Sequence, residues 1–490
     1  MFEEKKAAWL ARAEAFKPAL RTETVRPVAG MPAQALREND SVVLDFSNHF
    51  VGRLTLRLRS EGSHPDAPAW LQVKFCENSR ELNETLEGYQ GWISKGWVQQ
   101  EQVHVDVLPA VLALPRRYAF RYVRIDVLAL SSKYSLVIED AWAETTTSAD
   151  NSTVEALQGE KWEKDIDRVA LRTLRSCMQD VFEDGPKRDR RLWLGDLRLQ
   201  ALANSVTYRR FDLVKRCLYL FACAADGEGR IPACLFTEPQ VEGDDTYMFD
   251  YSLFFIPTLL QYARASGDRE TAEELLPLAL HQLKLAEERF DPETQLIRDS
   301  DQLGWCFVDW NLQLNKQCSA QAIWLYCAQA ALQLKEDPAL ASLIETRKAA
   351  MLAHWYDRER HLFVSGAERQ ISRASQVWAV LAGAVTGEEA RACLDAAAAC
   401  PEALAMVTPY MMHHYAEALC LVGRRQEARQ VIRDYWGAMV NGGADTFWEL
   451  FNPADPDESP YGSPVVNSYC HAWSCTPTWF LRSGVLGENS

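Results

Sequence analysis

Hydrophobic and polar residues alternate along the first ~150 residues of the chain, and the period then changes. Apolar residues occupy every second position in SVVLDFSNHFVGRLTLRLRS, AWLQVKFCEN, WVQQEQVHVDVL and YAFRYVRIDVLAL. A period of two is typical of strands with one buried face. We therefore expect residues 1–149 to form an antiparallel β-sandwich. A polar linker, TTTSADNSTVE, would follow and end in a helix N-cap at Ser152 or Thr153.

From about residue 160 the apolar positions recur every three or four residues, which predicts helices. The expected helices are 161–180, 197–208, 211–224, 251–266, 270–290, 318–335, 337–355, 373–386, 388–399, 410–421, 424–437 and 468–483. Short polar turns join most consecutive pairs, but long loops separate others, at 181–196, 226–250, 291–317 and 438–467. Long loops are uncommon in compact domains and are usually functional.

Helices joined by alternating short and long connections predict helical hairpins arranged in a closed ring. The fold class is thus a multidomain chain, with the β-sandwich followed by an all-α (α/α)6 barrel over residues 150–490. The long loops would then share one rim of the barrel. A helical solenoid is the alternative, but the chain has no repeat of fixed period and a solenoid would not need such loops.

Composition and charge narrow the class of protein. A chain of 490 residues that is 48% hydrophobic and 24% charged has the composition of a soluble globular protein. The net charge of −16 argues against nucleic acid or an anionic membrane surface as a partner. No segment approaches the roughly 18 apolar residues of a membrane span. A homodimer is expected from base rates alone.

The N-terminus and the cysteines bear on the compartment. The opening MFEEKKAAWLARAEAFK lacks the apolar core of a secretion signal. The 13 cysteines are scattered and form no C-x-x-C pair, which indicates reduced thiols. We expect a cytoplasmic protein without a required metal or other cofactor.

The densest cluster of charge is DGPKRDRRLWLGD, residues 184–196, in the first long loop. Asp184, Arg188, Asp189, Trp193 and Asp196 would converge there on one small polar ligand. Carboxylates accept hydrogen bonds from sugar hydroxyls, a guanidinium donates them, and a tryptophan offers a stacking face. The alternative is a salt-bridged helix N-terminus with Asp196 as the cap.

A second cluster is NGGADTFWELFNP, where Glu449 follows Phe447 and Trp448. A carboxyl among large aromatic side chains is a candidate for general acid–base chemistry. Alternatively, Glu449 simply extends past a pair of core aromatic residues. Downstream, in VNSYCHAWSCTPTWF, His471 would open the last helix.

Two further segments carry candidate residues. Asp250, in GDDTYMFDYSLFFIP, begins an apolar helix, and helix capping would explain it equally well. Trp305 and Trp310 lie on either side of Asp309 in LGWCFVDWNLQ. The two tryptophans either form the wall of a binding site or pack in the core. If all these loops share one rim, they form a single cleft. Two carboxylates across a tryptophan-lined pocket suit glycoside hydrolysis.

These motifs resemble the bacterial α-L-rhamnosidases, a family of inverting glycoside hydrolases with an (α/α)6 barrel. The family pattern is roughly D-x-P-x-R-(x)-E-R-x-x-W-x-G-D, and the matching residues are Asp184, Pro186, Arg188, Asp189, Arg190, Trp193, Gly195 and Asp196. TFWEL resembles the second catalytic segment of the family. LDFSNHFVGRLTLRLR and FRYVRI are similar to the β-sandwich that precedes the barrel, so the resemblance covers most of residues 40–485.

The resemblance implies roles for these residues. Asp189 would be the general acid that protonates the leaving oxygen, and Glu449 the general base that activates water. The implied substrate-binding residues are Asp184, Arg188, Trp193, Asp196, Asp250, Trp305, Trp310, Trp448 and His471. The implied ligand is a rhamnoside, with L-rhamnose as product. Because the chain ends after the expected twelfth helix, without the C-terminal β-domain of larger relatives, small substrates are expected.

The sequence departs from the family at one position, since Asp189 stands where glutamate is usual. Aspartate is one methylene shorter, about 1.5 Å of reach. Raising its pKa from about 3.9 to the roughly 6 that suits an acid at neutral pH costs about 3 kcal/mol. Arg188 and Arg190 would oppose that rise, whereas Asp184, Asp196 and burial would favour it.

The same residues allow alternative hypotheses. Asp184 or Asp196 is the alternative proton donor. The protein is otherwise an (α/α)6 glycosidase for another sugar, since pocket shape decides which sugar fits. A third reading is a catalytically silent sugar-binding homologue.

Overall fold

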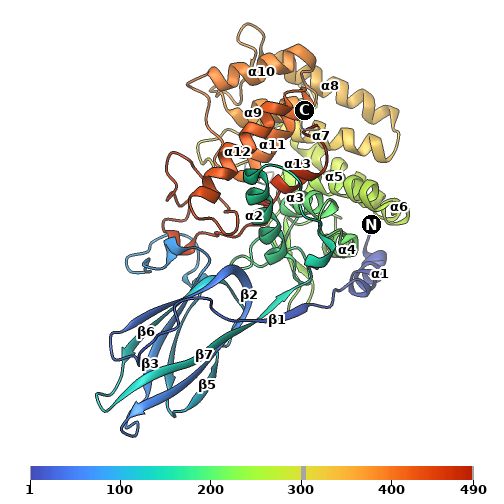
Figure 1. The fold of residues 1–490 in the computed structure, drawn as a ribbon. Helices are drawn as coiled ribbons and strands as arrows, with labels where there is room; N and C mark the ends of the chain where they lie inside the picture. The colour runs from blue at the N-terminus through green and yellow to red at the C-terminus, as the bar shows by residue number, and fades with distance from the viewer. Residues whose placement is uncertain (1, 299–304, 488–490) are drawn as a thin grey trace.

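The computed structural model describes residues 2–298 and 305–487. Strands form where the sequence alternates: β1 Arg21–Val25, β2 Ser41–Gly62, β3 Ala69–Cys76, β4 Gln100–Val105, β5 Ala110–Ala113, β6 Tyr118–Ala129 and β7 Tyr134–Thr147. They pair antiparallel in the order β1-β7-β2-β6-β3-β4, and β5 pairs with β2. The expected N-terminal antiparallel sheet domain is therefore confirmed (Figure 1).

The long strand β2 organises this domain. Its first half pairs with β6, and its second half pairs with both β7 and β5, so the sheet encloses one apolar core. The β2–β6 register shifts between Asp45 and Phe50, where Ser47 has a φ of 65°. A shift of this kind bends the strand and frees side chains from the ladder. It releases His49 toward the helical domain.

The second domain is helical: α2 Lys161–Cys177, α3 Leu194–Ser205, α4 Phe211–Ala224, α5 Phe249–Ser266, α6 Arg269–Ala286, α7 Gln317–Leu334, α8 Pro338–Trp355, α9 Arg373–Leu381, α10 Gly387–Ala399, α11 Pro409–Leu421, α12 Arg425–Asn441 and α13 Pro477–Arg482. Contacts run in order through α3, α5, α7, α9 and α11. The 3-10 turn η7, Ala472–Ser474, contacts both α11 and α3 and closes this inner ring.

The remaining helices stand outside the ring, and their sequences explain the difference. Helix α3 is buried on all sides from Leu194 to Asn204, whereas α2 and α12 bury one stripe and expose charged residues. Helix α3 is thus enclosed in the inner ring although it carries polar side chains, whereas the amphipathic α2 and α12 lie at the surface. The expected barrel is confirmed. Among the described residues, no helix combines the length and the apolarity needed to cross a membrane.

Three expected elements differ in the structure. Residues 145–147, expected in the linker, complete β7, and Asp150 caps a 3-10 turn at Asn151–Thr153, so the N-cap predicted there does not start a helix. Helix α2 begins at Lys161, the predicted first residue. The twelfth helix, predicted over 468–483, is only Pro477–Arg482. Its expected first turns instead run beside the Glu449 segment and bond to its backbone.

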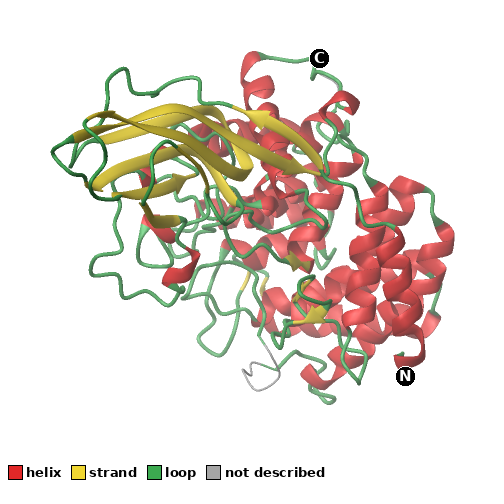
Figure 2. Cartoon of the chain, turned by 90° about the horizontal axis from the view of Figure 1, so that it is seen from below, coloured by secondary structure: helices red, strands yellow, loops and turns green. Residues whose placement is uncertain are grey.

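An N-terminal helix, α1 Glu3–Ala15, was not predicted. It packs against α4 and buries Trp9, whose indole N–H donates to Glu274 over 3.1 Å. The first residues of the chain therefore lie on the helical domain, although the expected boundary at 149/150 assigns them to the β-domain. Figure 2 shows the long loops gathered between the sheet and the helices.

Candidate active site

A cavity of about 500 Å³ opens where the long loops meet the β-domain. Its wall brings together predicted residues from three of the four long loops and from the start of the predicted last helix: Asp184, Arg188, Asp189, Trp193, Asp196, Trp305, Trp310, Glu449 and His471. The predicted residues Asp250 and Trp448 do not line it. The joint placement expected of these loops is therefore present in the fold.

Asp184 shapes the first loop. Its carboxylate accepts the backbone N–H of Asp189 at 3.0 Å and that of Arg191 at 3.1 Å, which folds the loop back on itself. Its own N–H donates to the Arg191 carbonyl, and its carbonyl accepts the N–H of Ala472 at 2.6 Å. A buried carboxylate with these partners fixes where Asp189 stands.

Asp196 lies in the first turn of α3, as the third residue of the helix and not as its cap. The N-cap is Trp193, which makes no side-chain capping bond, so the capping alternative for Asp196 is wrong. At Gly195 an added Cβ would lie 2.4 Å from the Tyr251 ring. Glycine lets α3 approach α5 and brings Asp196 into the cavity wall.

Arg188 joins the two expected catalytic carboxyls. Its Nη2 donates to Glu449 Oε2 over 2.7 Å, and its Nη1 lies 4.0 Å from Asp189 Oδ1. Its Nε donates to the Val466 carbonyl over 2.7 Å, and its guanidinium lies 4.1 Å from the Tyr461 ring centroid. The Tyr461 hydroxyl donates to the other Glu449 oxygen. The side chain of Glu449 is thus held at both oxygens.

His471 lies close to the carboxyl groups of Asp184 and Asp196. Its Nε2 lies 3.9 Å from Asp184 Oδ2, and its Nδ1 lies 3.5 Å from Asp196 Oδ1. Burial, and then the charge of Arg188, hold the pKa of His471 well below its usual value, so the ring is neutral. It is not the start of a helix, as expected, but the N-cap of the turn η7.

Several buried polar atoms in this wall have no hydrogen-bond partner among the described residues. They are Asp196 Oδ1, His471 Nδ1, Trp193 Nε1 and Trp310 Nε1. Buried polar groups are normally paired, and unpaired ones need an explanation. A ligand rich in hydroxyl groups would satisfy both the acceptor and the donors.

The carboxyls of the first loop hold protons more tightly than usual. Burial is the main cause of the raised pKa of Asp184, Asp189 and Asp196, and neighbouring carboxylates add to it. For Asp189 the positive charges of Arg188 and Arg191 work against burial. The expectation that burial would favour a protonated Asp189 agrees with this direction.

Arg190 was expected to oppose the rise in the pKa of Asp189, but the neighbouring Arg191 does so instead. Arg190 has a φ of 61° and its Nε donates to the Lys187 carbonyl over 3.2 Å, away from the cavity. Burial, with the nearby Arg117, lowers the pKa of Arg190 to about 10. Arg191 lines the cavity instead and lies 3.5 Å from Asp244.

Asp250 holds the aromatic loop rather than lining the cavity. Its fully buried carboxylate accepts the backbone N–H of Phe307 at 3.0 Å and that of Val308 at 3.1 Å. Beside it, the N–H of Phe249 donates to the Trp305 carbonyl over 2.7 Å. These bonds attach the loop to the start of α5 and present Trp305 to the cavity.

Trp448 points away from the cavity. Its ring packs edge-on against Phe451 at 5.5 Å and Tyr469 at 5.2 Å, and the Arg80 guanidinium lies 5.2 Å from its centroid. With Trp448 packed in the core, the side chain of the next residue, Glu449, lies in the cavity wall. Trp448 was expected to line the pocket, but it packs in the core instead.

Other residues of the cavity wall were not predicted from the sequence: Trp92, Ile93, Ser94, Trp97, Arg191, Asp244, Thr246, Met248, Tyr251, Phe307, Tyr461 and Trp473. The first four come from the β-domain, in the loop between β3 and β4, which lies beside the 442–476 segment (Figure 1). The segment GWISKGWV, two tryptophans in an irregular loop, was the available signal.

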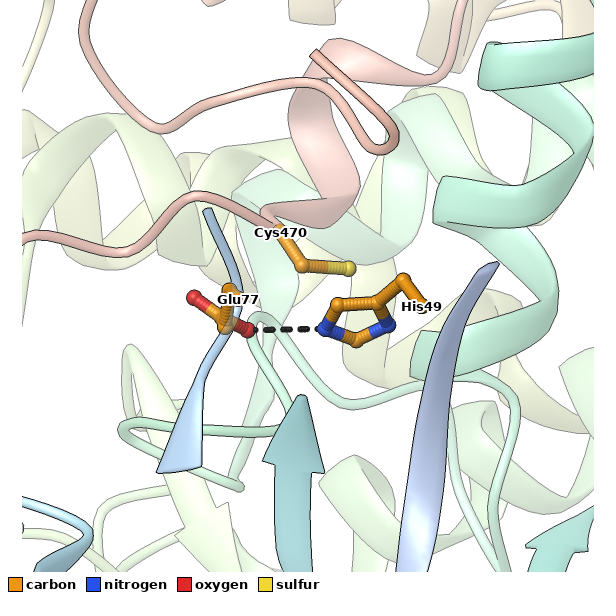
Figure 3. Close-up of side chains that lie close together, drawn as sticks. All are labelled: His49, Glu77 and Cys470. Carbon is orange, nitrogen blue, oxygen red and sulfur yellow. Dashed lines mark hydrogen bonds and ion pairs between the residues drawn. The ribbon is translucent and has the colours of Figure 1, made fainter. Parts of the chain in front are cut away.

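A buried cluster joins the domains close to the site. Figure 3 shows His49, Glu77 and Cys470, and the His49 Nε2 lies 3.1 Å from Glu77 Oε1. The other ring nitrogen, Nδ1, lies 2.9 Å from the Ser176 hydroxyl, and the Tyr469 N–H donates to Glu77 Oε2 over 2.8 Å. Strands β2 and β3 thus hold the segment that carries His471.

The same three side chains have the residue types of a metal site. However, both nitrogens of His49 and both oxygens of Glu77 already take part in hydrogen bonds. Burial also raises the pKa of the Cys470 thiol, which disfavours the thiolate that a metal needs. The cluster fits an interdomain hydrogen-bond network.

A second group of this kind is His413, His414 and Glu417 on α11. Burial, and then the charge of Arg198, hold the pKa of both histidines well below the usual value. The Arg198 guanidinium contacts His414 Nε2 directly. A guanidinium at that position repels a metal cation, so the group suits the structure of the barrel.

Comparison with known proteins identifies the family. Residues 10–145 match the N-terminal domain of glycosyl hydrolase family 78 α-rhamnosidases, and residues 160–485 match the bacterial α-L-rhamnosidase six-hairpin glycosidase domain. The chain belongs to the family 78 α-L-rhamnosidases. It is a glycoside hydrolase of that family. No curated protein gives a significant sequence match.

Solved structures agree with this family 78 assignment. A rhamnosidase from Klebsiella oxytoca, solved with rhamnose bound, is 46% identical, with 97% of this chain and 98% of that one covered and a TM-score of 0.94. The family 78 rhamnosidase of Bacillus sp. GL1 is 22% identical, over 91% of this chain and 46% of its own, with a TM-score of 0.73. The Streptomyces avermitilis α-L-rhamnosidase, at 17% identity, has a TM-score of 0.68 over 95% of this chain and 44% of its own. The last two show the fold alone.

Proposed function

We propose that this family 78 enzyme is an inverting α-L-rhamnosidase that removes terminal non-reducing α-L-rhamnosyl residues from small rhamnosides. Asp189 acts as the general acid and Glu449 as the general base. The rhamnose bound to the Klebsiella relative supports the sugar, and a cavity of about 500 Å³ supports a small substrate.

The observation that carries the mechanism is the bridge made by Arg188. The two terminal nitrogens of a guanidinium lie roughly 2.3 Å apart. With contacts of 2.7 Å to Glu449 and 4.0 Å to Asp189, the contacting carboxyl oxygens are at most about 9 Å apart. Inverting enzymes separate their carboxyls by roughly 6.5–9.5 Å, which leaves room for a water molecule. This limit admits the separation that a water-mediated displacement needs.

In this mechanism the sugar lies with its hydroxyls toward Asp184, Asp196 and His471, at the buried end. Asp189 gives its proton to the glycosidic oxygen, and the bond from that oxygen to the anomeric carbon breaks. Glu449 takes a proton from the water that attacks the opposite face. The raised pKa of Asp189 keeps its proton available.

Proton NMR of a rhamnoside digest tests the proposal. The first product is expected to be β-L-rhamnose, the inverted anomer. Glu449→Gln is expected to lower kcat by a factor of about 10² to 10⁴, the usual contribution of general acid–base catalysis. Release of α-L-rhamnose first, or unchanged turnover in Glu449→Gln, would contradict it.

The proton donor is tested separately with two leaving groups. Asp189→Asn should retain most activity on 2,4-dinitrophenyl rhamnoside, which leaves without protonation, and lose it on an alkyl rhamnoside. If Asp184→Asn or Asp196→Asn gives that pattern and Asp189→Asn does not, the donor is reassigned.

We further propose that the enzyme works in a reducing compartment, the cytoplasm. All 13 cysteines are free thiols, and most are buried. Unpaired cysteines in this number are typical of reducing surroundings. Cell fractionation followed by immunodetection checks the location; recovery from the periplasm would contradict it.

A further inference from the structure

We propose that a loop of the β-domain completes a binding site for the leaving group and that this site selects flat aromatic aglycones. The site is an aromatic rim made of Trp92, Trp310 and Trp305 at the mouth of the cavity. The inference rests on the proposed function, because a leaving group exists only if the enzyme cleaves a glycoside.

Exposure separates the two ends of the cavity. The polar residues at one end are almost inaccessible, with Asp184 4%, Asp196 2% and His471 3% exposed. At the other end Trp92 is 68% exposed and Trp305 44%. The hydroxyls of the sugar find their partners at the buried end, so the glycosidic bond and the leaving group point toward the aromatic rim.

The rim residues form a continuous arc. The ring centroids of Trp92 and Trp310 are 6.4 Å apart, and those of Trp310 and Trp305 are 6.2 Å apart, with tilted planes. Trp92 also stands edge-on to Tyr461 at 5.3 Å. Because the Tyr461 hydroxyl bonds to Glu449, a group resting on Trp92 is one side chain away from the reacting carboxyl.

The chemistry beside Trp92 favours an apolar ligand. The Tyr461 hydroxyl and the Arg188 guanidinium are already bonded to Glu449, and Ile93 adds an apolar side chain. A sugar placed there would find few polar partners beyond the Ser94 hydroxyl and the Trp310 indole N–H, so most of its hydroxyls would lose water without replacement. An aromatic ring instead covers the exposed face of Trp92, and offset or edge-to-face contact stabilises the pair.

The test compares 2-naphthyl and phenyl α-L-rhamnosides, whose leaving groups have nearly the same acidity but differ by one ring. In the unaltered protein, kcat/KM should favour the naphthyl substrate about two- to tenfold, the effect of one aromatic contact. Trp92→Ala should bring that ratio close to one, and Trp92→Phe should keep part of it. Because Trp92 is mostly exposed, its replacement should leave the Tm unchanged.

The matched control is Trp142→Ala, a tryptophan of β7 in the same domain that lies outside the cavity wall and should retain the ratio. A rhamnosyl-glucose disaccharide is the third substrate. An equal loss of disaccharide activity in Trp92→Ala would show a sugar subsite and overturn the aromatic class. A naphthyl preference that is absent, or that survives in Trp92→Ala, would overturn the site itself. If the unaltered protein cleaves none of the three substrates, the proposed function fails as well.

Discussion

Replacing Lys187 by methionine removes a buried positive charge where the β-domain meets the catalytic loop. Lys187 Nζ lies 2.5 Å from Glu81 Oε2 and donates to the Asn467 carbonyl over 2.8 Å. Both side chains of the ion pair are 1% exposed. In Lys187→Met the Glu81 carboxylate would stay buried without its partner, which costs about 3–5 kcal/mol of unfolding free energy.

A double variant separates the charge from the packing. In Glu81→Gln/Lys187→Met both charges of this ion pair are removed, and the amide oxygen can still accept the N–H groups of Glu77 and Asn78, which donate to Glu81 Oε1 in the unaltered protein. Only the bond to Asn467 is lost, a cost of about 1 kcal/mol. The double variant should therefore be more stable than Lys187→Met alone.

The pH dependence gives a further check. Burial raises the pKa of Glu81 in the folded protein, so the folded state binds a proton more tightly than the unfolded one. Stability then falls as pH rises from the unfolded value, about 4.3, toward the raised folded value. Without Lys187, which lowers that pKa, the fall should be steeper. Lys187→Met should thus be closest to the unaltered protein near pH 5 and furthest from it near pH 8.

Urea denaturation followed by tryptophan fluorescence measures these differences at both pH values. Two results would refute the reasoning: a cost below about 1 kcal/mol for Lys187→Met, or equal stabilities for the single and double variants. A larger loss at pH 5 than at pH 8 would refute the linkage argument.

Three further predictions follow from the site. The kcat/KM on an alkyl rhamnoside should fall with rising pH as Asp189, whose pKa burial raises, loses its proton; a pH profile in which Asp189→Asn keeps that alkaline limb would argue against this role. Asp250→Ala should leave the N–H groups of Phe307 and Val308 unpaired, which costs about 1–3 kcal/mol of stability per unsatisfied group, and should raise KM because Trp305 is no longer held. Calorimetry measures the stability and steady-state kinetics the KM; an unchanged KM would count against this role. Trp448→Ala should cost about 3–5 kcal/mol in stability, seen as a lower urea midpoint, with a KM change in the folded variant smaller than that of Asp250→Ala.

Some of this protein could be read from local sequence because periodicity is a local property. Alternation with a period of two marked the strands, and a period near 3.6 marked nearly all helices. The residues of the first loop act together within thirteen positions, so Asp184, Asp189 and Asp196 could be recognised as one cluster. The terminal helix was mispredicted because residues 468–471 bond to the Glu449 segment, a partner that local pattern does not reveal.

Contacts between distant segments were decided by the tertiary structure alone. Arg188 and Glu449 are 261 positions apart, and only the closed ring of helices sets their separation at 2.7 Å. Arg191 faces the cavity and Arg190 does not, because the Asp184 carboxylate binds the backbone N–H of Arg191 and the chain turns at Arg190. The sequence determined which side chains the chain carries and which elements they form. The packing of two domains determined that Trp92 joins the site, because burial and long-range contact are properties of the folded whole.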